Sequence, residues 1–303
     1  MNYKTQSSGK ILITSEYAVL KGALALAIPT RLKQTFSYLK NDSNSLIWKS
    51  YDSKNKIWFH CEFNLPNLNF ISKSHDNIGK ILHSILLSAK KINPNFLSIN
   101  YAGIINTKLE FPNNWGLGSS STLINNIAKW AKIDPYKLLW SNFNGSGYDI
   151  ACADSISPIL YKLEDKKPVI ENTSFNPLFS KNLFFIHLNK KQNTNIEIKN
   201  FYSKKVSANF IEAFSALTKK FILSNNLLDF QNCIIEHEKL LSKELNIPTV
   251  KNTLFSDYDG EIKSLGAWGG DFILAAGPID SPSYFTKKGY STIIPFKKMF
   301  KKN

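Results

Sequence analysis

A glycine-rich turn that runs directly into a helical pattern is the feature that most constrains this chain. The turn reads Gly116-Leu117-Gly118-Ser119-Ser120-Ser121, and apolar residues then recur at helical spacing at Leu123, Ile124, Ile127, Ala128 and Trp130. This spacing predicts a helix that begins near Ser119. The first amide groups of a helix lack intrahelical acceptors and lie at the positive end of its dipole, so the turn is predicted to bind an anion.

Phosphate is the anion that suits this turn best. Glycine lets the backbone approach a ligand closely, and serine hydroxyls can bond to phosphate oxygens or to magnesium. Serine is also a frequent helix cap without any ligand, so the turn alone leaves a plain capped helix open as an alternative. It is not a Walker A loop, because no Gly-Lys-Ser/Thr follows the glycines. A phosphate site here must belong to another nucleotide-binding class.

The positive charge of the chain is scattered rather than clustered. The formal net charge is +15, yet Arg31 is the only arginine, and the lysines are spread from Lys4 to Lys302. Nucleic-acid sites favour clustered charge and the bidentate contacts of arginine, so a nucleic-acid binder is not expected. The excess charge would still attract anionic small molecules.

The cysteines and the N-terminal residues indicate a reducing, cytoplasmic setting. Cys61, Cys152 and Cys233 lie far apart, without the paired spacing of a disulfide framework or a zinc site. The first ten residues carry no apolar core of a signal peptide, and no apolar run is long enough to span a bilayer. We therefore expect a cytoplasmic protein without a membrane partner.

Most of the chain reads as alternating strands and helices. The segment 10–20 begins with an apolar strand-like run that ends before Glu16, and a second buried strand is predicted at 23–29. The runs 45–48 and 57–60 predict a hairpin. Helices are predicted from Asp76, from Asp134-Pro135, and over about 206–224 and 227–245. Within the last of these, Glu236-His237-Glu238 predicts a solvated helix face, because successive helix residues cannot converge on one metal ion.

Three further segments combine polar residues with buried runs or with glycine-rich loops. Glu16 lies between two buried runs and needs an ion-pair partner, a capping role or a function. Asn144-Gly145-Ser146-Gly147 is a glycine-flanked loop that presents Asp149. The stretch Gly266-Ala267-Trp268-Gly269-Gly270-Asp271 is a second glycine-rich loop, and so many small residues would let another backbone or a ligand approach.

Taken together, three of these segments resemble the three motifs of the GHMP kinase superfamily, which includes galactokinase, homoserine kinase, mevalonate kinase and phosphomevalonate kinase. They are Ser-Gly-Lys-Ile-Leu-Ile-Thr-Ser-Glu-Tyr-Ala-Val-Leu at 8–20, Gly-Leu-Gly-Ser-Ser-Ser at 116–121 and Gly-Ala-Trp-Gly-Gly-Asp at 266–271. Their order and spacing both fit, and the resemblance spans nearly the whole chain.

Motif detail is closest to phosphomevalonate kinase. Glu16-Tyr17-Ala18 resembles its first motif, Asn144-Gly145-Ser146 with Asp149-Ile150-Ala151-Cys152 resembles its acceptor segment, and Gly269-Gly270-Asp271 resembles its third motif. Mevalonate kinase carries a magnesium-binding glutamate on the preceding helix, and 137–143 contains no carboxylate. Two positions depart from the family pattern: Ser15 replaces a glycine before the glutamate, and Trp268 replaces a central glycine.

The resemblance implies an α/β (α+β) fold of two halves. Residues 1–174 would form an ATP-binding half like ribosomal protein S5 domain 2, and residues 175–303 a ferredoxin-like half. The implied activity is ATP-dependent phosphorylation of a small molecule, phosphomevalonate first, with mevalonate or another acceptor of this superfamily as the alternative. We expect a monomer or a homodimer.

The resemblance also assigns roles to residues of this sequence, with ATP and Mg²⁺ as the implied cofactors. Lys10 and Asp149 would be catalytic, the lysine stabilising charge on the transferred phosphoryl group and the aspartate orienting or deprotonating the acceptor. The 116–121 turn would hold the phosphates, with Ser120 reaching magnesium. The residues expected near the acceptor and the terminal phosphate are Glu16, Ser146, Gly266, Ala267, Gly269 and Gly270.

A second class of function stays open beside the kinase. A non-catalytic ligand sensor on this fold would keep the nucleotide turn but lose Lys10 or Asp149, and both are present. A nucleic-acid binder would show a steep dependence of binding on salt concentration, which an enzyme with a small acceptor does not require.

Overall fold

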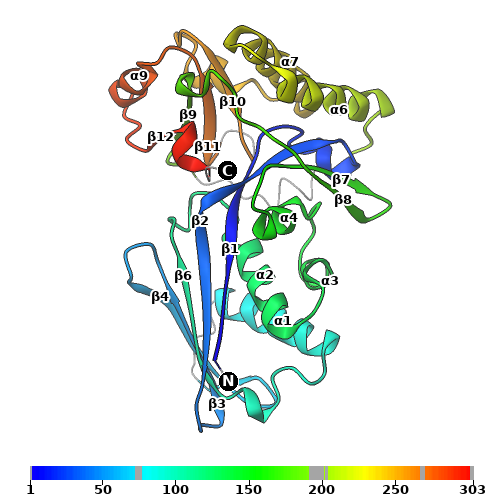
Figure 1. Ribbon diagram of the computed structural model, residues 1–303, viewed down its shortest axis with the longest axis vertical. Helices are drawn as coiled ribbons and strands as arrows, with labels where there is room; N and C mark the ends of the chain where they lie inside the picture. The colour runs from blue at the N-terminus through cyan, green and yellow to red at the C-terminus, as the bar shows by residue number, and fades with distance from the viewer. Residues whose placement is uncertain (1, 72–76, 191–200, 202–203, 267–269, 301–303) are drawn as a thin grey trace. The chain divides into compact units, whose positions relative to one another are not determined.

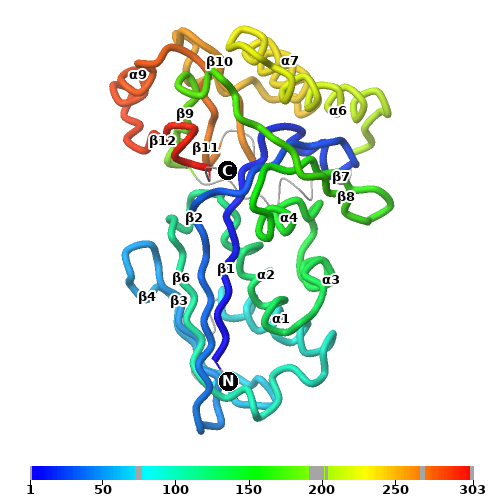
Figure 2. The backbone as a smooth tube through the Cα atoms, viewed as in Figure 1, coloured from blue at the N-terminus to red at the C-terminus, as the bar shows by residue number. Residues whose placement is uncertain are grey.

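The chain forms two compact units, each assembled from separate stretches of sequence (Figures 1 and 2). The computed structural model describes residues 2–71, 77–190, 201, 204–266 and 270–300. Unit 1 comprises Met1–Gly9, Leu32–Asn113 and Leu117–Asp154, and unit 2 comprises Lys10–Arg31, Asn114–Gly116 and Ser155–Asn303.

Unit 1 is built on a sheet whose strands run in the order β5-β4-β3-β6-β2, with β1 also paired to β2. Strands β3 and β4 form the predicted hairpin, and β3 and β6 run parallel, whereas β2 and β6 run antiparallel. The strands span Asn2–Leu12 (β1), Ala25–Lys40 (β2), Ser45–Tyr51 (β3), Ile57–Asn64 (β4), Asn69–Phe70 (β5) and Gly103–Leu109 (β6).

The helices of unit 1 cover one face of this sheet (Figure 1). They are α1 (Asn77–Ile92), α2 (Ser119–Ala131), α3 (Pro135–Trp140) and α4 (Tyr148–Asp154), with a 3₁₀ turn at Ile99–Tyr101. Trp130 of α2 fills the space between sheet and helices, its ring centroid 5.4 Å from that of Phe36 and 4.7 Å from that of Phe96. The predicted start of α2 is confirmed, as is the Asp134 cap of α3, whose carboxylate accepts from the Tyr136 amide at 2.8 Å.

Unit 2 contains a four-stranded antiparallel sheet in the order β10-β11-β9-β12. Its strands are β9 (Leu183–His187), β10 (Glu261–Ser264), β11 (Phe272–Ala276) and β12 (Ile293–Pro295). Two further strands, β7 (Ile159–Glu164) and β8 (Lys167–Asn172), pair with each other, and β7 pairs with Ala25–Ala27 of β2.

The helices of unit 2 are dominated by α6 (Ala208–Leu223) and α7 (Leu227–Leu245), which Figure 2 traces side by side. Both were predicted, and both begin at a side-chain cap: Ser207 accepts from the Phe210 amide at 3.2 Å and Asn226 from the Asp229 amide at 2.9 Å. The shorter ones are α8 (Val250–Leu254), α9 (Ser281–Lys287), α10 (Phe296–Met299) and the 3₁₀ turns Ala18–Lys21 and Ser180–Asn182.

The strand-like run predicted to begin at Lys10 forms the end of β1, which stops at Leu12, before Glu16 as expected, and the chain then forms the 3₁₀ turn at Ala18–Lys21, closed by Gly22 at φ 89°. One strand boundary differs from the sequence prediction. The strand expected over 23–29 begins at Ala25 and continues through Pro29 to Lys40. Pro29, which has no amide hydrogen to donate, lies between the stretch of β2 that pairs with β7 and the stretch that pairs with β6, so it takes part in neither of these two ladders. The α/β (α+β) class itself is as predicted, and no helix among the described residues could span a bilayer.

Candidate functional site

The glycine turn ends in an uncapped helix N-terminus. Gly118 adopts the left-handed conformation (φ 87°, ψ 42°) at the N-cap of α2, and as a glycine it contributes no capping side chain. Its carbonyl accepts from the Thr122 amide at 3.0 Å, so the amides ahead of Thr122 in the first turn have no intrahelical acceptor. These amides lie at the positive end of a helix of 13 residues, which suits an oxyanion such as phosphate.

The serines that follow Gly118 differ in what they offer to a ligand. Ser121 is buried and its hydroxyl donates to the Gly118 carbonyl at 2.9 Å, so it serves the turn itself. Ser119 is half-buried and Ser120 is exposed. Ser120 is therefore the hydroxyl that is open to a phosphate or a metal ion, and its assignment to magnesium stays a prediction.

A buried polar network that sequence patterns did not indicate fixes helix α2 in unit 1. The Asn125 side-chain amide donates to the Ser7 hydroxyl at 3.0 Å, and the Ser7 hydroxyl donates to the side-chain oxygen Oδ1 of Asn126 at 2.8 Å. Thr122 donates from its hydroxyl to Gln34 at 3.0 Å. Because both asparagines and Ser7 are almost fully buried, these bonds hold α2 against β1 and β2 and so fix the direction of its first turn.

Asp149 lies in the first turn of α4. Its side chain is half-buried and accepts from the next backbone amide, that of Ile150, at 3.1 Å. Gly147 at φ 89° turns the chain into the helix, and the preceding Ser146 is 3% exposed. Asp149 and Ser146 thus lie on the same short segment of unit 1, at the N-terminal end of α4.

Tyr136 is a polar neighbour of Asp149 that the sequence did not indicate. Its hydroxyl is buried and has no hydrogen-bond partner among the described residues. Burial raises the pKa of Tyr136 well above its usual range, and the Asp149 carboxylate adds to the effect. A buried hydroxyl without a partner is costly, so Tyr136 is the group near Asp149 that would gain most from a bound polar molecule.

The other predicted site residues lie in unit 2. Lys10 is half-buried in β1 and has interactions of its own. Gly266 adopts φ 69° at the end of β10, and Gly270 is buried just before β11. Ala267 and Gly269, together with Trp268, lie outside the described residues. The grouping of Lys10 and Asp149 around a single ligand stays a prediction.

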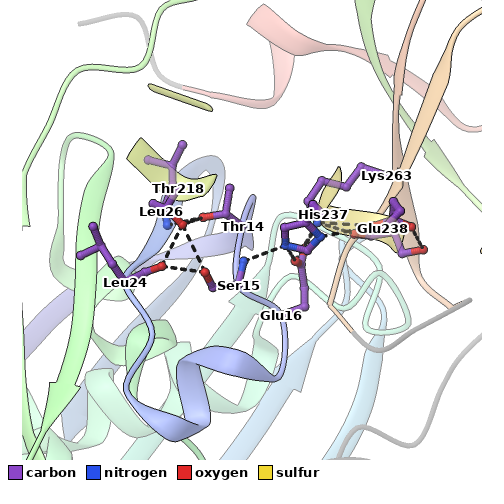
Figure 3. Close-up of polar contacts among 10 residues, drawn as sticks. Thr14, Ser15, Glu16, Leu24, Leu26, Thr218, His237, Glu238 and Lys263 are labelled. Atoms are coloured by element: carbon purple, nitrogen blue, oxygen red, sulfur yellow. Dashed lines mark hydrogen bonds and ion pairs between the residues drawn. The ribbon is translucent and has the colours of Figure 1, made fainter. Parts of the chain in front are cut away.

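Glu16 belongs to a fully buried charged cluster in unit 2 (Figure 3). Both of its carboxylate oxygens lie 2.7 Å from the Lys263 Nζ, which also donates to the Ser264 carbonyl at 3.0 Å. His237 Nε2 lies 3.1 Å from Glu16 Oε2. The lysine side chain is 0% exposed and the glutamate 2%, so each charge depends on the other for its stability.

Glu238 completes this cluster, which we call the Glu16 cluster. Its Oε2 accepts from the Ser264 hydroxyl at 3.0 Å, and its Oε1 lies 3.7 Å from His237 Nδ1 and 3.9 Å from Lys263 Nζ. The expected solvated face at Glu236-His237-Glu238 is therefore wrong for two of its three residues, since only Glu236 is exposed. The reason is that α7 packs against β10, which turns His237 and Glu238 toward Lys263 and Glu16.

The geometry of the Glu16 cluster is that of an ion pair. No group of three or more His, Cys, Asp or Glu side chains in the described part of the chain is arranged to hold a metal ion. The Lys263 ammonium occupies the place between the carboxylates instead. The cluster is thus an ion-pair network that joins the first loop to α7 and β10.

Acid is expected to weaken the folded state through Glu16. Burial alone would raise the pKa of this carboxyl, but the Lys263 ammonium and then His237 outweigh burial, so the pKa lies below its ordinary value of 4.5. A depressed folded pKa stabilises the protein above the unfolded value, and that stability is lost as pH falls from about 4.5 through the folded value. Urea unfolding of the wild type and of Glu16→Gln between pH 7 and pH 3 measures this directly. The wild type should lose the additional stability below pH 4.5, and parallel curves for the two proteins would contradict the assignment.

Comparison with solved structures identifies the fold. No protein-family model matches the sequence, and no curated protein matches it. The structure is similar to Methanococcus jannaschii mevalonate kinase, with a TM-score of 0.65, 17% identity and 97% of both chains covered. It is also similar to Streptococcus pneumoniae phosphomevalonate kinase in complex with phosphomevalonate and AMPPNP, with a TM-score of 0.64, 17% identity and 95% of both chains covered.

Lactococcus lactis galactokinase complexed with galactose is similar as well, with a TM-score of 0.64, 12% identity, and 94% of this chain and 88% of that chain covered. All of these proteins are GHMP kinases, and each match extends over nearly the whole chain. The chain has the GHMP kinase fold.

One departure from the GHMP kinase pattern has a physical explanation in the structure. Ser15, which stands where the family has glycine, adopts φ 64°, a left-handed conformation that glycine accepts without steric cost. Its amide donates to His237 Nε2 at 3.0 Å, and its hydroxyl donates to the Leu24 carbonyl at 2.6 Å (Figure 3). These two bonds hold Ser15 in the left-handed conformation.

Proposed function

We propose that this protein is an ATP-dependent kinase of a small molecule, with phosphomevalonate as the first candidate acceptor. The observation that carries the proposal is the uncapped N-terminus of α2 behind the left-handed Gly118, with the Ser120 hydroxyl exposed beside it. This arrangement suits the phosphates of a nucleotide, and it occurs on a fold similar to that of a phosphomevalonate kinase whose structure contains AMPPNP. The net charge of +15 favours anionic ligands in addition.

Phosphoryl transfer asks the protein mainly to position groups and to stabilise charge. In this proposal an oxygen of the acceptor attacks the γ-phosphorus while the bond from that phosphorus to the β,γ-bridging oxygen breaks, so ADP leaves. The backbone amides of 116–121 hold the phosphates, Lys10 stabilises charge on the transferred group, and Asp149 orients the acceptor. Ser146 lies on the segment before Asp149, and Gly266, Ala267, Gly269 and Gly270 approach the acceptor.

Magnesium fits the donors that the chain supplies. Mg²⁺ at such sites is held by substrate phosphates, water and one or two protein oxygens rather than by a full protein cage. The exposed Ser120 hydroxyl offers one oxygen, and the described residues contain no preformed metal cluster. When bound, the ion neutralises charge on the β- and γ-phosphates.

Phosphomevalonate is favoured over mevalonate by the segment around Asp149. Asn144-Gly145-Ser146 and Asp149-Ile150-Ala151-Cys152 resemble the corresponding segment of phosphomevalonate kinase, and α3 carries no carboxylate in the place of a magnesium-binding glutamate. At 12% to 17% identity the structural neighbours support the kinase class more than any one acceptor.

A panel of acceptors tests the function. The protein is incubated with ATP, Mg²⁺ and phosphomevalonate, mevalonate, homoserine or sugars, and ADP is measured. ADP formed with phosphomevalonate is the expected result, and ADP formed with mevalonate alone would reverse the order of the candidates. Nucleotide binding by calorimetry without ADP from any acceptor would favour a non-catalytic sensor, and no nucleotide binding at all would end the proposal.

A further inference from the structure

The segment that enters the glycine turn, Asn114–Gly116, rests on the four-stranded sheet of unit 2. His187 of β9 and Phe272 of β11 are partners in register, with ring centroids 5.0 Å apart. The Trp115 ring lies edge-on to Phe272 at 5.4 Å and 6.1 Å from His187. A cross-strand aromatic pair of this kind forms a rigid surface, and Trp115 packs on it.

His187 adds a directional bond to this contact. The imidazole is 3% exposed, and its Nε2 lies 3.3 Å from the Asn114 carbonyl oxygen. A carbonyl can only accept, so Nε2 carries a proton and donates to Asn114. The other nitrogen, Nδ1, accepts from the Asn189 amide at 3.2 Å, and Asn189 Oδ1 lies at the same distance. Asn189 therefore fixes the imidazole ring through Nδ1, and the ring fixes the Asn114 carbonyl through Nε2.

Asp271 shows how closely the segment approaches the sheet. A Cβ added to Gly116 would lie 2.2 Å from Asp271 Oδ2 and 2.9 Å from Asp271 Cβ, and the second distance is too short for two side-chain carbons. Rotation of the Asp271 side chain would not relieve the contact with its Cβ, because the Asp271 amide donates to the Lys190 carbonyl and its carbonyl accepts from the Leu188 amide, both at 2.8 Å. Glycine at 116 is therefore required by the fit to unit 2 as well as by its φ of 63°.

We propose that His187 is a positioning residue for the nucleotide turn. By fixing the Asn114 carbonyl, it sets the path on which the chain enters Gly116 before a ligand binds. A turn already held in its binding conformation loses less conformational entropy when the phosphates arrive, so the affinity for ATP is higher. The role rests on the proposed function, since it concerns the same nucleotide site.

Two amide variants separate the hydrogen bond from ring packing, because both remove the imidazole ring and only one of them keeps a donor for Asn114. Glutamine places a donor near the position of Nε2, and asparagine places an acceptor near the position of Nδ1 but does not reach Asn114. His187→Asn should raise the KM for ATP about three- to tenfold, the factor that one hydrogen bond supports, with a smaller change in kcat. His187→Gln should stay close to the wild type. His60→Asn is the control, because His60 is exposed on β4.

Hydrogen exchange of the ligand-free protein provides a readout that needs no activity. His187→Asn should speed amide exchange in 115–117 by a similar factor, and His187→Gln should not. If both variants lower thermal stability equally and leave the KM for ATP unchanged, His187 is only a packing residue and the proposal is overturned.

If the proposed function itself is wrong, calorimetry gives a different result. In that case the wild type itself binds no ATP by calorimetry, and the positioning role falls together with the nucleotide site. If the wild type binds ATP and His187→Asn binds it equally well, the kinase proposal stands and only the positioning role is lost.

Discussion

Replacing Asp149 with asparagine is expected to lower turnover by roughly two or more powers of ten, the size usual for a positioned acid-base group. Asparagine has the shape of aspartate, and its side-chain oxygen can still accept from the Ile150 amide, so the start of α4 should stay intact. What is lost is the negative charge that orients or deprotonates the acceptor. The measurement is kcat with ATP, Mg²⁺ and the acceptor identified by the panel.

Asp154 offers a matched control on the same helix. It is 65% exposed and forms an ion pair with Lys129, so Asp154→Asn removes a carboxylate from α4 without touching the proposed chemistry. Its kcat should stay within about twofold of the wild type, since exposed ion pairs contribute little. Near-normal turnover of Asp149→Asn, with the fold intact, would remove Asp149 from the mechanism.

Replacing Lys263 with methionine should cost about 3–5 kcal/mol of unfolding free energy, the range found when one partner of a buried ion pair is removed. Methionine keeps the unbranched stem and the volume but leaves Glu16 and Glu238 as buried carboxylates without their cation. Urea unfolding at pH 7 measures the effect. A lower midpoint, with an unchanged dependence of the unfolding free energy on urea concentration, would show that stability has changed and that the compactness of the folded and unfolded states has not.

Two further variants define the origin of this loss. Lys220→Met removes the exposed ion pair between Lys220 of α6 and Glu236 of α7 and should cost less than about 1 kcal/mol. Glu16→Gln combined with Lys263→Met removes both charges and should recover part of the stability, because no uncompensated carboxylate remains at Glu16. A double variant that is as unstable as Lys263→Met, or less stable, would show that the loss comes from packing.

Local chemistry made several elements predictable. The start of α2 follows from two glycines and a run of serines ahead of a helical pattern, and α3 follows from the Asp134-Pro135 cap. The hairpin of β3 and β4 follows from two aromatic runs around a polar turn. In each case the residues that determine the element lie within a few positions of one another.

The Glu16 cluster was not predictable in the same way. The helical period shows that Glu236, His237 and Glu238 point away from α7 in different directions. It cannot show that β10 packs against the side of the helix that carries His237 and Glu238. Lys263 stands in a short strand, and nothing near it in sequence indicates that its partner is Glu16 rather than the neighbouring Glu261. His187 has the same difficulty, because its partner Asn114 is 73 residues away. These contacts depend on tertiary packing, which a single sequence does not display.

The Glu16 cluster also sets an order of events when the chain is made. Glu16 and Lys263 are 247 residues apart, so at ribosomal speeds of about 5–20 residues per second the carboxylate emerges roughly 12–50 s before its cation. Burying Glu16 without Lys263 would leave an unpaired carboxylate in the protein interior, which is costly, so until then Glu16 is more stable in water. The Glu16 cluster can therefore form only after β10, which carries Lys263, has been translated.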